Sequence, residues 1–171
     1  FTVIAVDTRG QGRSSEDGKI YNYDLFAEDM NALLGYLHLD SVNIVGWSDG
    51  GNTGLIMAMK YPAKVKKLVT MGANVFIDDS VLDKWVFKLL NKEKKKLKND
   101  SFNNSSNRLR LINMMLTEPK HSFEELKMIK CPVLVMAGEK DVIKPGHTKS
   151  VAAAIPNGTL MIAPGETHYF P

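Results

Sequence analysis

The chain has 171 residues, 44% of them apolar and 24% charged, with a net charge of +3, which suits one domain with one hydrophobic core. No stretch approaches the roughly 18 consecutive apolar residues of a membrane span, and the first residues have the pattern of a strand, not of a signal peptide. The single cysteine, Cys131, excludes an internal disulfide. These features predict a cytoplasmic protein without a membrane partner.

The predicted elements alternate between strands and helices. Apolar, β-branched runs predict buried strands at residues 1–6, 41–47, 67–73, 132–137 and 159–163. Helical spacing and stop signals predict helices at residues 23–39, 49–61 and 146–155. This alternation predicts an α/β fold with a mostly parallel sheet that is flanked by helices.

Residues 78–129 interrupt the alternation. They carry no strand signal, and residues 81–90 and 108–116 have amphipathic helical patterns. Because structureless loops of this length are uncommon in compact domains, we predict a helical lid inserted into a core of residues 1–77 and 130–171. The lysine-rich stretch 92–98 is interpreted as a solvated helix face, because no aromatic residues alternate with the lysines. No nucleic-acid partner is therefore expected.

The segment Gly46-Trp47-Ser48-Asp49-Gly50 matches the pattern G-x-S-x-G between a predicted strand and a predicted helix. At such a junction the chain turns sharply and exposes the serine hydroxyl. We expect Gly46 and Gly50 to be required there, because a Cβ at either position would clash across the turn. The backbone N–H of Asp49 lies at the predicted helix N-terminus and is expected to be an oxyanion-hole donor.

A serine hydroxyl needs a base, and the base needs an orienting carboxylate, before the serine becomes a good nucleophile. Asp141 ends the sequence GEKD after the fourth predicted strand, and His168 ends GETH after the fifth. Because the carboxyl ends of parallel strands meet at one edge of a sheet, Ser48, Asp141 and His168 are predicted to be catalytic. Glu139 is an alternative orienting acid.

These motifs resemble those of the α/β-hydrolases. The turn DTRGQGRS at residues 7–14 is similar to the turn after the family's fourth strand, and with GWSDGG, GEKD and GETH the resemblance covers the chain outside the predicted lid. The elbow GWSDGG, with GAN at residues 72–74, is most similar to the biphenyl-hydrolase-like serine esterases. The resemblance implies an α/β-hydrolase fold and a carboxylesterase-type reaction on a small ester or amide, without a cofactor or metal ion.

The resemblance also implies missing parts. Residue 1 corresponds to the family's strand four, so strands one to three, one oxyanion-hole donor and the closing helix fall outside the sequence. We expect either that these residues belong to a longer protein or that residues 1–6 pair directly with residues 41–47. An open gap would cost about 1–3 kcal/mol for each buried unpaired backbone group. The isolated fragment is expected to be weakly active or inactive.

Substrate contacts are predicted for Trp47 and Asp49, beside the serine, and for Met114 and Met115 in the lid. The lid side chains either line an acyl pocket or pack the lid onto the core. Asp49 either favours the helix dipole or attracts a substrate amine. A non-catalytic binding protein on the same scaffold is an alternative function. A second alternative is a cofactor-free perhydrolase or C–C bond hydrolase that uses the same three residues. The protein could also form homo-oligomers, which the sequence does not decide.

Overall fold

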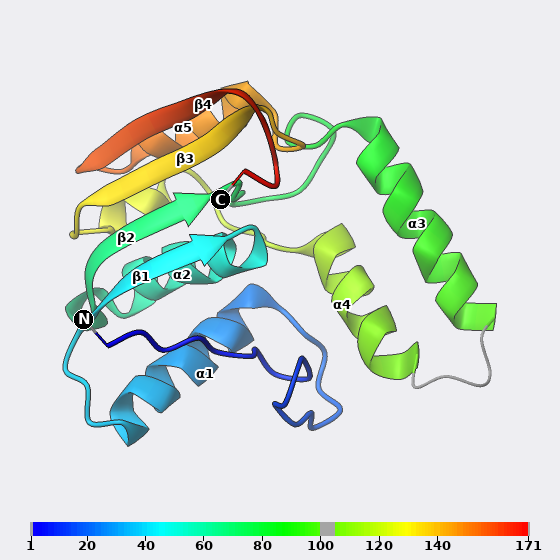
Figure 1. Ribbon diagram of the computed structural model, residues 1–171, viewed down its shortest axis with the longest axis horizontal. Coiled ribbons are helices and arrows are strands. Elements are labelled where there is room, and N and C mark those ends of the chain that lie inside the picture. The colour runs from blue at the N-terminus through cyan, green and yellow to red at the C-terminus, as the bar shows by residue number, and fades with distance from the viewer. Residues whose placement is uncertain (1, 100–104, 171) are drawn as a thin grey trace.

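The computed structural model describes residues 2–99 and 105–170. Within these residues the chain forms a four-stranded sheet, and α3 and α4 extend to one side of it (Figure 1). The elements in chain order are α1 (Tyr23–Tyr36), β1 (Val42–Trp47), α2 (Asp49–Lys60), β2 (Val65–Met71), α3 (Lys84–Asn99), α4 (Ser105–Thr117), β3 (Val133–Lys140), α5 (Pro145–Ala154) and β4 (Gly158–Thr167). Short 3-10 helices span Pro62–Lys64 and Glu125–Met128.

The sheet is parallel throughout, with the strand order β1-β2-β3-β4, as the strand–helix alternation predicts. β1 and β4 therefore lie at opposite edges. Parallel pairing brings the carboxyl ends of all four strands to the same edge of the sheet, which is where sites form in open α/β folds. Residues that directly follow β1, β3 and β4 consequently lie near one another.

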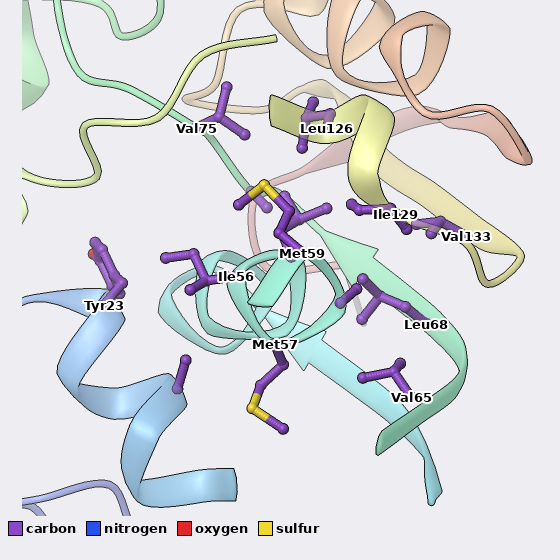
Figure 2. Packing of buried hydrophobic residues seen from close by; sticks show 14 of the residues in the cluster. Tyr23, Ile56, Met57, Met59, Val65, Leu68, Val75, Leu126, Ile129 and Val133 are labelled. Atoms are coloured by element: carbon purple, nitrogen blue, oxygen red, sulfur yellow. The ribbon is translucent and has the colours of Figure 1, made fainter. Parts of the chain in front are cut away.

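Helix α2 is the centre of the hydrophobic core. All residues from Gly51 to Met59 are buried, because α2 packs against α1 on one side and against β1 and β2 on the other. Figure 2 shows Ile56, Met57 and Met59 leaving α2 on different sides, within a cluster that includes Leu68 of β2. Because α2 is buried on all sides, the surrounding elements hold it in place, and its packing therefore also fixes the position of the turn before it.

The opposite face of the sheet is exposed. Strand residues alternate between the two faces, and Val45 (71% exposed), Trp47 (41%) and Met161 (46%) point away from the core. The register places Trp47, Met71, Met136 and Met161 in one row across the four strands. This row and the neighbouring Val45 make an apolar surface on that face.

The predicted first strand does not form. Residues 2–8 belong to no strand, and Val3 and Ile4 are 87% and 50% exposed, while Phe1 lies outside the described residues. The expected direct pairing of this segment with β1 is absent among the described residues. The physical reason is that a strand is stable only beside a partner, and none of the four described strands pairs with this segment.

The amphipathic stretches predicted at residues 81–90 and 108–116 form the longer helices α3 and α4, which pack against each other (Figure 1). Leu97 of α3 and Met114 of α4 are buried. In the part of the chain that the structure describes, no helix is both long enough and apolar enough to cross a bilayer.

Candidate active site

Ser48 lies at the junction of β1 and α2 with φ 52° and ψ −116°, a left-handed backbone that non-glycine residues rarely adopt. A Cβ on Gly46 would lie 2.2 Å from the carbonyl oxygen of Gly50, so glycine is required at residue 46. A Cβ on Gly50 would meet nothing within 4 Å, so the predicted requirement for Gly50 is wrong. Gly51 is the second constrained glycine, because its Cβ would lie 2.6 Å from Thr70 Oγ1.

The structure brings Ser48, Asp141 and His168 together. His168 Nε2 lies 3.0 Å from Ser48 Oγ, and His168 Nδ1 lies 2.8 Å from Asp141 Oδ1. The carboxylate is the acceptor of the Nδ1 proton, which leaves Nε2 free to accept the serine proton. Ser48 follows β1, Asp141 follows β3 and His168 follows β4, so the shared carboxyl edge of the sheet positions all three.

Asp141 is held in place by its surroundings. Its side chain is 1% exposed, and Oδ1 also accepts the backbone N–H of Ile143 at 2.9 Å. The alternative acid, Glu139, lies elsewhere: it is exposed, and its Oε2 accepts the backbone N–H of Gly165 at 2.7 Å. Of the two carboxylates considered from the sequence, Asp141 is therefore the one that contacts His168.

Asp49 begins α2, directly after the serine. Its backbone N–H is in the first turn, so it has no acceptor within the helix and is free to bind an anionic oxygen. Its carboxylate accepts a hydrogen bond from the hydroxyl of Tyr23 at 2.5 Å. Burial raises the pKa of Asp49, and burial together with the nearby Asp49 charge raises the pKa of Tyr23 well above its usual value.

The other predicted substrate contacts lie in two different environments. Trp47 contacts the base: its indole Nε1 donates to the backbone carbonyl of His168 at 2.7 Å. Met114 is 1% exposed and belongs to the hydrophobic core, whereas Met115 is half-buried on the same helix. Of the two alternatives for the lid side chains, Met114 therefore packs α4 onto the core.

The sequence did not predict that two buried amide side chains, Asn52 and Asn74, contact each other near the site. Asn52 of α2 accepts the backbone N–H of Asn74 at 2.8 Å and donates to the side chain of Asn74 at 3.1 Å. The Asn74 side chain in turn donates to the carbonyl of Phe76. These bonds fix the segment after β2 against α2. The available signal was an asparagine in an otherwise apolar helix, since buried amides need partners.

Comparison with known proteins identifies the family to which the chain belongs. The model of the α/β hydrolase fold family matches residues 1–110, and the chain belongs to that family. The chain is 30% identical over 184 residues to the human serine hydrolase BPHL, covering 98% of this chain and 63% of that protein, which confirms the similarity inferred from the elbow. The chain thus spans less than two thirds of that relative's length.

Further matches agree on the fold. A putative carbamate hydrolase, RutD, of a Caulobacter strain is 26% identical, with coverage of 99% of this chain and 75% of that protein. Among solved structures, an esterase from Exiguobacterium antarcticum has a TM-score of 0.77 at 20% identity, covering 95% of this chain and 72% of the other. A hydrolase-family protein from Bacillus anthracis has a TM-score of 0.76 at 18% identity, with coverage of 94% and 73%.

Proposed function

We propose that these residues, within a complete α/β-hydrolase that also supplies the second oxyanion-hole donor, form a serine hydrolase that cleaves carboxylic esters, or related acyl bonds, of small molecules through an acyl-enzyme. The activity measurements refer to that complete protein. The observation that supports this is the chain of two hydrogen bonds from Ser48 Oγ through His168 to Asp141, at 3.0 and 2.8 Å. Ester, amide and carbamate cleavage all begin with the same attack on a carbonyl carbon, so this geometry suits the whole group of substrates.

The proposed reaction has two halves. His168 Nε2 takes the hydroxyl proton as Ser48 attacks the carbonyl, and Asp141 stabilises the imidazolium and holds the ring in its tautomer. The Asp49 N–H donates to the oxyanion, where the N-terminal dipole of α2 adds to the stabilisation. His168 then protonates the leaving group. In the second half, a water molecule activated by His168 releases the acyl group and regenerates Ser48.

Replacement of the serine tests the proposal directly. Ser48→Ala is expected to abolish covalent labelling by a fluorophosphonate probe and to lower ester hydrolysis by at least about 10⁴-fold, because Ser48 supplies the hydroxyl that contacts His168 Nε2 among the described residues. Ser150→Ala, on the exposed surface of α5, is the matched control and should label like the unmodified protein. Labelling of Ser48→Ala at the unmodified rate would remove Ser48 from the role.

We further propose that the Asp49 carboxylate favours substrates with a cationic group, such as aminoacyl esters. It lies one residue from the nucleophile and is half-buried, so a neighbouring positive charge would be attracted more strongly than in open water. Asp49→Asn should lower the ratio of aminoacyl-ester to neutral-ester kcat/KM by about tenfold, the value of a charge-assisted hydrogen bond. Tyr23→Phe removes the hydrogen bond but keeps the charge, so it should largely preserve the ratio.

The two variants separate charge from geometry. An unchanged ratio in Asp49→Asn would show that the carboxylate plays no part in selection. An equal loss in Tyr23→Phe would show that side-chain orientation, and not charge, determines the preference.

A further inference from the structure

We infer that Trp47 is a positioning residue: its indole holds the backbone of His168 so that both imidazole nitrogens keep their partners. The inference rests on the proposed function, in which His168 is the base. It assigns to Trp47 a role in the geometry of the base itself, separate from the substrate contact that the sequence suggested.

His168 lies beyond the part of the chain that the sheet stabilises. The last paired residue of β4 is Thr167, opposite Lys140 of β3, and His168 follows it. β4 is at the opposite edge of the sheet from β1, so the imidazole reaches Ser48 across the ends of β3 and β2. The next residue, Tyr169, is 77% exposed. A base on such a segment needs a contact on the β1 side to keep its direction.

Trp47 provides that contact. Its Nε1 donates to the His168 carbonyl at 2.7 Å, and the two rings pack with centroids 5.4 Å apart. Tyr169 completes the group, with its ring 5.6 Å from Trp47 and 5.7 Å from His168. Aromatic rings at these separations attract one another, so the three side chains restrain the segment jointly.

The position of Trp47 in the chain makes this contact effective. It directly precedes Ser48 at the end of β1, where the turn into α2 is constrained by the buried Gly46. The nucleophile and the group that holds the base are therefore adjacent residues on one rigid segment. A small movement of the end of β1 carries both together and preserves the distance from Ser48 Oγ to His168 Nε2.

Trp47→Phe removes the N–H and keeps an aromatic ring. We expect kcat for ester hydrolysis to fall roughly tenfold with KM changed less than about twofold, because a misdirected base slows the reaction without removing a substrate contact. The chain has two tryptophans, and the second, Trp85 of α3, is 55% exposed. Trp85→Phe is the matched control, and its kcat and KM should equal those of the unmodified protein.

A second readout does not depend on activity. In nitrogen-15 spectra of the histidine rings, assigned by comparison with His168→Ala, the unmodified protein and Trp85→Phe should show one fixed tautomer of His168 with the proton on Nδ1. Trp47→Phe should show a mixture of tautomers. The tautomer measurement remains informative even if the protein hydrolyses no ester. Absence of ester hydrolysis would contradict the proposed function, but it would not contradict the role of Trp47.

Fluorescence tests the contact without changing Trp47, should Trp47→Phe fail to fold. In Trp85→Phe the only tryptophan is Trp47. Adding His168→Ala to Trp85→Phe should shift the Trp47 emission to longer wavelength, because the indole loses the imidazole ring that packs against it at 5.4 Å. Three results would overturn the inference: an unchanged His168 tautomer in Trp47→Phe, a rise in KM at constant kcat, or a Trp47 emission that His168→Ala leaves unchanged. A fall in kcat with mixed tautomers would support it.

Discussion

At the scale of single residues, the side chains of the triad directly constrain Gly72, at the end of β2. It has φ +60°, and a Cβ there would lie 2.6 Å from His168 Cε1 and 2.7 Å from His168 Nδ1. Because carbon atoms pack at about 3.5–4.0 Å, the ring would have to move by about 1 Å. Gly72→Ala should therefore lower kcat about 100-fold, measured by ester hydrolysis and by the rate of fluorophosphonate labelling.

The positive φ also costs stability, so a control must separate the two effects. Gly18 has φ +78°, and a Cβ there would meet nothing within 4 Å. Gly18→Ala should lower the free energy of unfolding by about 1 kcal/mol, as any left-handed alanine does, without affecting kcat. If Gly72→Ala kept the activity of Gly18→Ala, the contact between residue 72 and the imidazole would not constrain the base.

The sequence predicted Ser48, Asp141 and His168 because each follows a strand, and parallel pairing forces strand ends to one edge. It did not predict the contacts of Gly72 and Trp47 with His168. Those contacts depend on how the chain after β4 crosses the ends of β3 and β2, which no local pattern encodes. The supposed need for Gly50 failed for a related reason, since backbone clashes depend on the path of the turn and not on the motif.

At the scale of elements, a buried histidine ties α5 to the segment after β2. His147 is packed between Phe76 and Phe123, with ring centroids 4.9 and 5.3 Å away, and its Nε2 accepts the N–H of Val75 at 3.3 Å. Burial lowers the pKa of His147 to about 4, against a small opposing effect of the charge on Asp78. The neutral ring is thus the form that the fold accommodates.

This shift in pKa predicts an acid-dependent loss of stability. The unfolded chain binds a proton at His147 near pH 6.5, whereas the folded protein does so only near pH 4. The stabilisation that neutral His147 gives the folded protein is therefore fully present above pH 6.5. It decreases as the pH drops from 6.5 toward 4 and does not change further below pH 4. A shift of this size corresponds to about 3 kcal/mol. Urea unfolding of the unmodified protein from pH 7.5 to 4 measures it.

His147→Phe isolates this group from the carboxylates that titrate in the same range. The variant loses the acceptor for Val75 at every pH, which lowers its stability by a constant amount, but its stability should fall less steeply between pH 6.5 and 4. His38→Asn is the matched control, because His38 is exposed and its φ of 53° suits asparagine. Equal slopes for His147→Phe and the unmodified protein would contradict a depressed pKa.

The strands also show which elements a sequence can predict. β1 to β4 were predicted because their apolar runs carry the pattern of buried strands and a neighbour is present for each. The equally apolar run at residues 2–6 is not a strand, although Val3, Ile4 and Val6 are typical strand residues. Strand propensity describes how a residue fits beside a partner, and it cannot show whether the partner is present.

At the scale of the whole molecule, the two faces of the sheet have opposite environments. On one face α2 and α5 bury side chains such as Leu68, which is 1% exposed. On the other face Val45, Trp47 and Met161 leave a contiguous apolar surface in contact with solvent. Exposed apolar surfaces of this kind bind hydrophobic dyes and promote association. A polypeptide of these 171 residues should therefore bind anilinonaphthalene sulfonate in its native state.

Lysine substitutions on the two faces distinguish a surface that is open in solution from one that is covered. Val45→Lys should leave the free energy of unfolding within about 0.5 kcal/mol of the unmodified polypeptide, because an exposed side chain loses little on replacement. It should also reduce dye binding and self-association, measured by fluorescence and light scattering. Leu68→Lys, on the neighbouring strand, buries a charge and should prevent stable folding. If Val45→Lys were as damaging as Leu68→Lys, residue 45 would be packed against another surface in solution. Trp47, on the same face, would then be enclosed as well, and its contact with His168 would be protected from water.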